Sequence, residues 1–217
     1  GTAYFNSVVS TLLHTILGLL ITAATAYPLS KRDLPLGKLV TLMIVFTMLF
    51  NAGTIPNYLW VRDLGLIDSL WALVLPGLVA PYNLIIMRNF FKNIPGELEE
   101  SALIDGANPI FIFIRIILPL SKAVLATVAL WIAVGTWNNF FSALLYLNDR
   151  SLYTLPLLLR DIINGQVQAM QDGREQLSSS TTVVAATIMV SVIPILCTYP
   201  FLQKYFVKGV MVGSVKG

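Results

Sequence analysis

Residues 97–119 read ELEESALIDGANPIFIFIRIILP, and the rest of the chain is organised around this stretch. It begins with three glutamates among its first four residues and then becomes almost continuously apolar. Apolar segments of membrane-crossing length lie on both sides of it. We therefore expect this stretch to be a stiff connection between two membrane-spanning parts of the chain, in contact with the aqueous phase.

The local chemistry of the stretch predicts two short helices that meet at a turn. Asn93 is placed to cap the first helix, with Pro95 near its first turn and the glutamates beside the positive end of its dipole. Gly106 predicts a stop, because glycine adopts the left-handed conformation at a helix end without steric cost. Asn108 and Pro109 then repeat the start signal. The expected local structure is helix, tight turn, helix.

One face of the first helix is a candidate contact surface for a partner. Leu98, Ala102 and Asp105 lie at i, i+4 and i+7 and so share one stripe. Ala102 and Gly106 are small enough to let a partner's backbone approach. The alternative is an amphipathic connector on the lipid surface, and Asp105 can equally serve as a local cap of the turn.

Three groups of residues follow one another here: Glu100-Ser101-Ala102, Asp105-Gly106-Ala107 and Ile117-Leu118-Pro119. Together they resemble the "EAA" loop of permease subunits from binding-protein-dependent ABC importers, in the sugar-uptake branch that includes the maltose-type permeases. Ser101 stands where the family has its first alanine, and serine is still small enough for a close contact. Ala123 replaces a second proline found in many members, which leaves the start of the next span less sharply defined.

The resemblance continues beyond the loop, at Trp137-Asn138-Asn139 and in residues 199–206 followed by Gly209, where the chain is similar to oligosaccharide permeases. It implies an all-α, polytopic membrane helical bundle with the type I ABC importer permease fold. Residues 1–217 would form a single permease domain, with a cytoplasmic coupling loop at about 91–121, an outer loop at about 148–180 and a cytoplasmic tail at about 203–217. The C-terminal similarity suggests a branch that handles larger saccharides, acidic ones among them.

The composition independently predicts an integral membrane protein. The 217 residues are 56% hydrophobic and only 12% charged, whereas an ordinary globular domain is about 25% charged. Five apolar segments reach the roughly 20 residues that a transmembrane helix needs: residues 8–27, 39–60, 69–90, 123–147 and 181–202. Members of the family have six spans, so the resemblance implies that a first span is missing from this sequence.

The basic residues predict the orientation in a bacterial cytoplasmic (inner) membrane. With the coupling loop inside, ten of the fourteen Lys and Arg residues are cytoplasmic, which agrees with the positive-inside rule. The C-terminus is then cytoplasmic and the loop at 148–180 lies outside. In that loop, residues 152–163 are apolar enough to pack as a helix on the membrane surface, and residues 164–180 are expected to project.

No sequence feature provides an energy source within the chain. None of the eleven Asp and Glu residues lies in a predicted span, although ion-coupled transporters commonly need an intramembrane carboxylate. His14 lies in a span, but a lone histidine among threonines is more often a packed, hydrogen-bonded group. There is no G-x-x-x-x-G-K-[ST] phosphate loop, and the single Cys197 excludes a cysteine-cluster metal site. We expect neither catalysis nor a bound metal or cofactor in this chain.

The resemblance implies that the coupling loop docks on a cytoplasmic ATPase subunit, which binds ATP and Mg²⁺ and moves the spans between inward-facing and outward-facing states. Further implied partners are a second permease subunit, a second ATPase subunit and an extracytoplasmic sugar-binding protein, which the outer loop would meet. The residues expected to make the ATPase contact or the bend are Glu97, Glu100, Ser101, Ala102, Asp105, Gly106, Ala107 and Pro119.

The C-terminal tail is a second candidate ATPase contact, through Gln203, Lys204, Lys208 and Gly209. Its alternative role is a basic anchor at the lipid headgroups. Two other classes of function remain open at this stage: a stand-alone secondary transporter or channel, and a membrane anchor that only assembles an enzyme. The first would predict intramembrane charges or broken-helix repeats, and the second would leave the bend at Gly106 without a moving part to drive.

Polar and aromatic side chains within the spans are candidates for lining a sugar pathway. Amides supply donors and acceptors for hydroxyl groups, and aromatic rings stack on the C–H faces of sugars. The candidates are Asn51, Asn57, Tyr58, Tyr82, Asn83, Trp137, Asn138 and Asn139. The alternative for the asparagines is hydrogen bonding between helices, and the companion permease can carry most of the substrate contacts.

Overall fold

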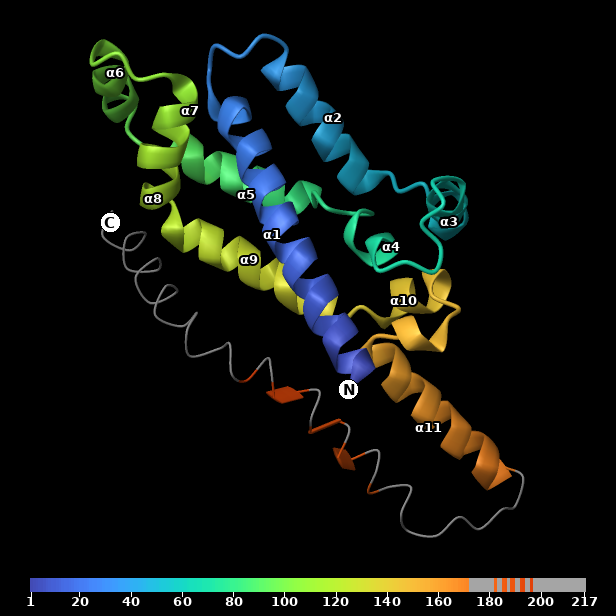
Figure 1. Cartoon of the computed structure of the whole chain (residues 1–217). Helices are drawn as coiled ribbons and strands as arrows, with labels where there is room; N and C mark the ends of the chain where they lie inside the picture. Colours follow the sequence, from blue (N-terminus) through green and yellow to red (C-terminus); the bar gives the residue numbers. More distant parts are fainter. Residues whose placement is uncertain (172–181, 183–184, 187, 190–191, 194–195, 197–217) are drawn as a thin grey trace, which may run out of the picture. The chain divides into compact units, whose positions relative to one another are not determined.

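The computed structural model describes residues 1–171 and eight further residues, 182, 185, 186, 188, 189, 192, 193 and 196 (Figure 1). Within this part the secondary structure is helical throughout, so the predicted all-α class is confirmed. The predicted fifth span at 181–202 lies mostly, and the tail at 203–217 entirely, outside the described residues. The elements are α1 (Thr2–Ser30), α2 (Gly37–Leu49), α3 (Thr54–Asp63), α4 (Trp71–Val74), α5 (Pro81–Lys92), α6 (Glu97–Ile104), α7 (Pro109–Ile112), η1 (Phe113–Ile117), α8 (Leu118–Leu120), α9 (Lys122–Trp137), α10 (Phe140–Tyr146), η2 (Arg150–Leu152) and α11 (Leu155–Gln171).

The chain forms two compact units that are each assembled from separate segments. Unit 1 contains Gly1–His14, Gly53–Pro76 and the described residues from Ala133 onward. Unit 2 contains Thr15–Ala52 and Gly77–Ile132. Helices α1 and α9 each contribute one part to unit 1 and the other part to unit 2.

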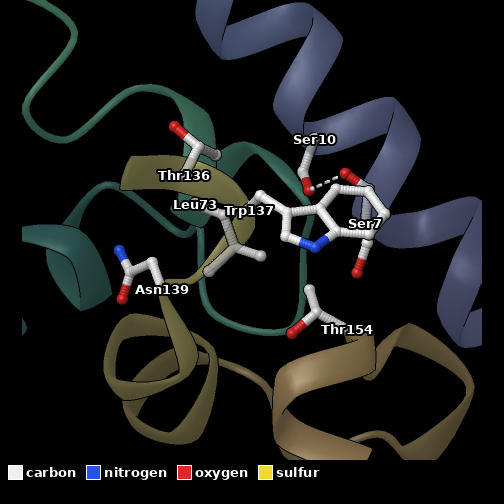
Figure 2. A pocket seen from close by; sticks show the side chains of 7 residues that line it. All are labelled: Ser7, Ser10, Leu73, Thr136, Trp137, Asn139 and Thr154. Carbon is white, nitrogen blue, oxygen red and sulfur yellow. Dashed lines mark hydrogen bonds between the residues drawn. The ribbon is translucent and has the colours of Figure 1, made fainter. Parts of the chain in front are cut away.

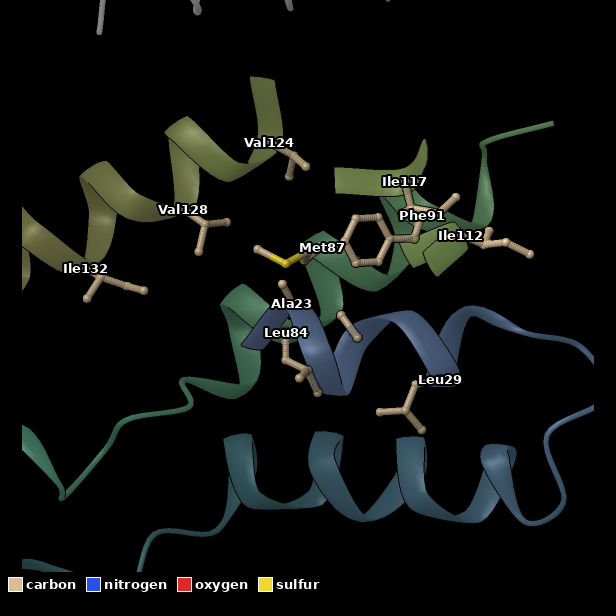
Figure 3. Packing of buried hydrophobic residues seen from close by; sticks show 11 residues of the cluster. Ala23, Leu29, Leu84, Met87, Phe91, Ile112, Ile117, Val124, Val128 and Ile132 are labelled. Atoms are coloured by element: carbon tan, nitrogen blue, oxygen red, sulfur yellow. The ribbon is translucent and has the colours of Figure 1, made fainter. Parts of the chain in front are cut away.

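The core of unit 2 is built by helices α1, α5 and α9 together with the segment after α6 (Figure 3). Each of the three helices contributes a stripe at helical spacing, as in Val124, Val128 and Ile132 of α9. Ile112 and Ile117, on the short helices α7 and η1, are 1% and 0% exposed and so are fixed in the same core. The full set is Ala23, Ala26, Leu29, Leu84, Met87, Phe91, Ile112, Ile117, Val124, Val128 and Ile132.

Unit 1 has its own core and a set of polar connections. The buried residues of its core cluster are Val61, Ala72, Leu73, Ala143, Tyr146, Leu147 and Leu157. At the start of α1, Asn6 Nδ2 donates to the carbonyl oxygens of Ser151 at 2.8 Å and Tyr153 at 3.2 Å. Ser7 Oγ accepts from the backbone N–H of Leu155 at 2.8 Å. These bonds hold α1 against the segment that begins α11.

The predicted spans correspond only partly to continuous helices. Residues 8–27 lie within the 29-residue α1, the one helix in the described part that is long and apolar enough to cross a membrane by itself. Up to three spans result if α2 with α3, and residues 109–120 with α9, are each counted as one bent span. Within the predicted spans 39–60, 69–90 and 123–147 the helix is interrupted, at residues 50–53, around Pro76 and Gly77, and at residues 138–139.

Each break has a local cause that overrides the apolar composition. Gly53 and Gly77 have φ of +90° and +75°, a conformation that ends a right-handed helix. Asn139 accepts from the N–H of Ser142 and thereby starts α10 as a new helix. In the predicted outer loop, α11 begins at Leu155 and continues to Gln171, so the first part of the segment expected to project is helical.

Candidate functional site: the coupling hairpin

The first arm of the site is α6, which starts with charge but without a side-chain cap. Gly96 occupies its N-cap position, and Glu97, Glu99 and Glu100 lie in its first turn, where they interact favourably with the helix dipole. The prediction that Asn93 caps this helix is wrong. Helix α5 continues to Lys92, and the N–H of Asn93 donates to Phe90 O at 3.1 Å, so Asn93 ends the preceding helix.

The turn after α6 is closed by two backbone hydrogen bonds around Gly106. The N–H of Ala107 donates to Ala102 O at 2.9 Å, and the N–H of Gly106 donates to Leu103 O at 3.0 Å. Gly106 has φ of +80°, and this combination is the Schellman motif, which satisfies the last carbonyls of a helix. The exposed carboxylate of Asp105 has no hydrogen-bond partner among the described residues. The backbone, and not the Asp105 side chain, therefore closes this turn.

The second arm begins two residues later with α7. Asn108 Oδ1 accepts from the N–H of Phe111 at 2.8 Å, and Pro109 occupies the first turn. Pro is tolerated there because the N–H it lacks would have no partner. The predicted helix, tight turn, helix is confirmed, and we call α6, the turn and α7 the coupling hairpin.

The segment after α7 widens into the π-helical turn η1, Phe113–Ile117. Its last hydrogen bond runs from the N–H of Leu118 to Phe113 O. Pro119 cannot donate to the carbonyl four residues before it and would clash with that carbonyl in a regular α-helix. A wider turn at this point removes the clash, which gives a physical reason for the π-helix. Ser121 then separates α8 from α9.

An open groove of about 490 Å³ lies at the turn of the hairpin. The residues that line it are Ala102, Asp105, Gly106, Ala107, Asn108, Phe111 and Ile116. Four of the predicted coupling residues are among them. The other four, Glu97, Glu100, Ser101 and Pro119, are exposed to solvent outside the groove. The structure thus brings half of the predicted set together around one concave surface and leaves the other half exposed outside it.

The hairpin also exposes large apolar side chains that the sequence analysis did not select. Ile104 is 87% exposed, Ile110 71%, Leu103 52% and Phe111 50%. A group of exposed apolar residues bordered by carboxylates is typical of a protein contact surface. The signal in the sequence was the adjacent apolar pair Leu103 and Ile104 at the end of a short helix that begins with three glutamates. The predicted stripe of Leu98, Ala102 and Asp105 is only partly available to a partner, because Ala102 is half-buried and packs against the chain's own core.

The predicted pathway residues are divided between the two units. Asn51, Tyr82 and Asn83 belong to unit 2, and Asn57, Tyr58 and Trp137 to Asn139 belong to unit 1. Tyr82 is 55% exposed, and its ring centroid lies 5.7 Å from that of Trp131. Asn83, in contrast, is 8% exposed. Tyr58 stacks on Tyr146 with ring centroids 6.2 Å apart, and Asn51 and Asn57 are exposed.

Trp137 and Asn139 line a small polar cavity in unit 1 (Figure 2). Ser7 and Ser10 of α1, Leu73, Thr136 and Thr154 complete its lining. Its volume of about 10 Å³ is the space of one water molecule and is too small for a sugar ring. The side-chain amides are also engaged locally, since Asn138 Nδ2 donates to Val134 O at 2.9 Å and Asn139 Nδ2 donates to Ser142 Oγ at 2.9 Å. In this conformation the two asparagines stabilise helix ends.

The remaining candidates are the C-terminal tail, a metal site and His14. The candidate tail contacts Gln203, Lys204, Lys208 and Gly209 lie outside the described residues. Within the described residues, no three His, Cys, Asp or Glu side chains come together as potential metal ligands. His14 Nδ1 lies 3.3 Å from Leu73 O, a contact within unit 1.

The chain is similar in sequence to a known protein family and to two proteins of Bacillus subtilis. Residues 2–212 match the family described as "Binding-protein-dependent transport system inner membrane component". Protein LplC of Bacillus subtilis is 47% identical over 214 residues, which cover 97% of this chain and 72% of that protein. The polygalacturonan/rhamnogalacturonan transport system permease protein YtcP of Bacillus subtilis is 46% identical over 215 residues, covering 97% of this chain and 75% of YtcP.

A solved structure is similar over most of its length. The crystal structure of a bacterial ABC transporter involved in the import of the acidic polysaccharide alginate contains a chain that superposes with a TM-score of 0.85. The two chains are 34% identical, and the match covers 94% of this chain and 74% of the other.

Proposed function

The chain belongs to the family of binding-protein-dependent transport system inner membrane components, and from this premise we propose that it is the transmembrane permease subunit of an ATP-driven oligosaccharide importer. Membership confirms the predicted resemblance and the predicted fold class, a helical type I ABC importer permease. A protein of this family is a transport component and not an enzyme, so ATP hydrolysis belongs to a partner. A stand-alone secondary transporter is not favoured.

The substrate class rests on the similar proteins. One relative is named for polygalacturonan and rhamnogalacturonan transport, and the similar structure is named for alginate import. Both names refer to long saccharides, and alginate is named as acidic. We assign oligosaccharides to this chain as the substrate class, and acidic oligosaccharides as the members to test first.

The observation that carries the coupling role is the coupling hairpin itself. Two short helices are locked by the Schellman turn at Gly106 and the cap at Asn108, and they present exposed apolar side chains beside carboxylates. Ile112 and Ile117 hold the base of this element in the core of unit 2. A stiff protrusion of this kind is suited to transmit a partner's movement to the spans.

The assembly proposed around this chain has four further protein subunits. A second permease subunit completes the membrane part, two cytoplasmic ATPase subunits bind ATP and Mg²⁺, and an extracytoplasmic binding protein delivers the sugar. In this arrangement the coupling hairpin and the C-terminus are cytoplasmic, the outer loop meets the binding protein, and the tail residues Gln203 to Gly209 form a second ATPase contact. The chain itself binds no cofactor.

The test is reconstitution of the complete importer in lipid nanodiscs, with the permease co-expressed with its neighbouring subunits. ATP hydrolysis is measured with and without binding protein loaded with neutral or uronate-containing oligosaccharides. We expect loaded binding protein to stimulate hydrolysis, and Ile104→Ser to reduce capture of the ATPase subunit. The control is Ile55→Ser on α3, which replaces an isoleucine of similar exposure: Ile55 is 73% exposed and Ile104 is 87% exposed. Failure of the wild type to capture any ATPase would overturn the proposal.

A further inference from the structure

The cytoplasmic end of α1 is connected to the coupling hairpin through one carboxylate. Glu99 Oε2 accepts from Tyr27 Oη at 3.1 Å and also pairs with Lys31 Nζ. Its two neighbours among the glutamates of α6, Glu97 and Glu100, are exposed, whereas the side chain of Glu99 is only 17% exposed. All these residues belong to unit 2.

The dipole of α6 does not explain why Glu99 turns inward. Any carboxylate in the first turn stabilises the helix end, and Glu97 and Glu100 do so from solvent. A half-buried carboxylate loses hydration and therefore depends on the partners that replace water. Both partners of Glu99 come from α1 or the residue that follows it, so the position of Glu99 is defined by α1.

Tyr27 extends the connection from α6 to the rest of the loop. Its ring stacks on Phe113 of η1 with centroids 5.0 Å apart, and it meets the ring of Phe91 of α5 edge-on at 6.3 Å. Lys31 Nζ lies 4.3 Å from the centre of the same ring, a cation–π contact. One side chain of α1 therefore contacts the element before the hairpin, its first arm and the segment after its second arm.

Resting on the proposed function, we propose that Tyr27, Lys31 and Glu99 are positioning residues that transmit movement of the coupling hairpin to α1. When a partner shifts α6, either α1 follows or the ion pair opens and leaves Glu99 half-buried without its cation. The second outcome is unfavourable because a partly desolvated, unpaired carboxylate is costly. The link thus favours states in which the hairpin and α1 move together.

The test uses the complete importer in proteoliposomes and measures sugar uptake per ATP hydrolysed. Glu99→Gln and Lys31→Met each break the ion pair, and Tyr27→Phe removes only the hydroxyl group. The matched controls are Asp33→Asn and Arg32→Gln, which change exposed charges a few residues away. We expect uptake per ATP to fall about three- to tenfold in Glu99→Gln and Lys31→Met, the range typical of mutations along a coupling element, and less in Tyr27→Phe.

The exchanged pair Lys31→Glu with Glu99→Lys separates transmission from folding. It restores opposite charges, so we expect it to recover at least half of the lost uptake per ATP. Assembled complexes in which Glu99→Gln has wild-type uptake per ATP would overturn the inference, as would variants that lower only the melting temperature. Wild-type uptake and ATPase capture are measured in parallel. If the wild type itself fails in both, the proposed function is wrong, and this outcome is distinct from a failure of the link between α1 and the hairpin.

Discussion

At the scale of single residues, position 106 has a backbone conformation that restricts which amino acid can occupy it. A Cβ atom added at Gly106 would meet no other atom within 4 Å, so steric crowding is not the reason for glycine at this position. The reason is the backbone φ of +80°, which side-chain-bearing residues rarely adopt. A left-handed conformation costs an alanine about 1 kcal/mol, whereas asparagine tolerates it better. Gly106→Ala should therefore lower the melting temperature and ATPase stimulation, and Gly106→Asn should stay closer to wild type.

Gly135 provides the matched control for Gly106. It lies inside α9, its Cβ position is also open, and its φ is not positive. Gly135→Ala should therefore be neutral or stabilise by up to about 1 kcal/mol, as measured by thermal unfolding in detergent. Equal effects of alanine at the two glycines would contradict the conformational explanation.

Asp68 is a second residue with an unusual backbone, at φ +57°, and its carboxylate joins two loops of unit 1. The N–H of Asp149 donates to it at 3.0 Å, and the N–H and side chain of Asn148 also donate. These donors lower the pKa of Asp68 below its ordinary value of 3.8. A lowered folded pKa means that the stabilisation is fully present above the unfolded pKa and is lost as pH falls through the folded pKa.

The expected result is a pH-dependent difference between wild type and Asp68→Asn, which keeps the tolerance for this backbone conformation. The wild type should melt at a higher temperature at pH 7, and the difference should decrease below about pH 4. Melting curves from pH 7 to pH 3 measure it, with the exposed Asp63→Asn as control. A difference that stays constant over this range would show that the carboxylate charge is not the cause.

At the scale of elements, the coupling hairpin separates residues that hold it from residues that face outward. Ile112 is 1% exposed and Ile110 71% exposed on the same short helix. Ile112→Ala should destabilise the protein by about 2–5 kcal/mol, the usual cost of a buried cavity. Ile110→Ala should leave the melting temperature nearly unchanged and weaken ATPase capture.

This pair of variants distinguishes two roles for α7. Thermal unfolding and ATPase pull-down are measured on both proteins. If both variants lowered stability equally and neither changed capture, α7 would be a structural connector and not a docking element.

The elements also show what the sequence could and could not predict. Gly106 and Pro109 act through their own backbone geometry, and the side chain of Asn108 caps a residue three positions later. All three signals are local, so the hairpin was predictable from the sequence. Asn93 was assigned to the wrong helix because its cap preference does not reveal that α5 extends to Lys92. The apolar composition did not locate the breaks inside these segments, because composition measures apolar character and not continuity of the helix.

Contacts between distant residues were beyond local sequence reasoning. Tyr27 and Glu99 are 72 positions apart, and nothing in the spacing of the three glutamates indicates which one turns inward. The exposed Ile104 was likewise missed, because an apolar residue at the end of a short helix is equally consistent with burial. Both features depend on how α1 packs against the coupling loop.

At the scale of the whole molecule, the energy source separates the proposed importer from a stand-alone secondary transporter. The eleven Asp and Glu residues all lie outside the spans predicted from the sequence, so we expect no carboxylate within the membrane for ion coupling. Uptake by the reconstituted importer should therefore continue at about the wild-type rate after a protonophore and a sodium ionophore collapse the ion gradients. It should stop when ATP is replaced by a non-hydrolysable analogue. Uptake that survives the analogue but stops with the ionophores would assign the driving force to an ion gradient, and the hairpin would then have no ATPase movement to transmit.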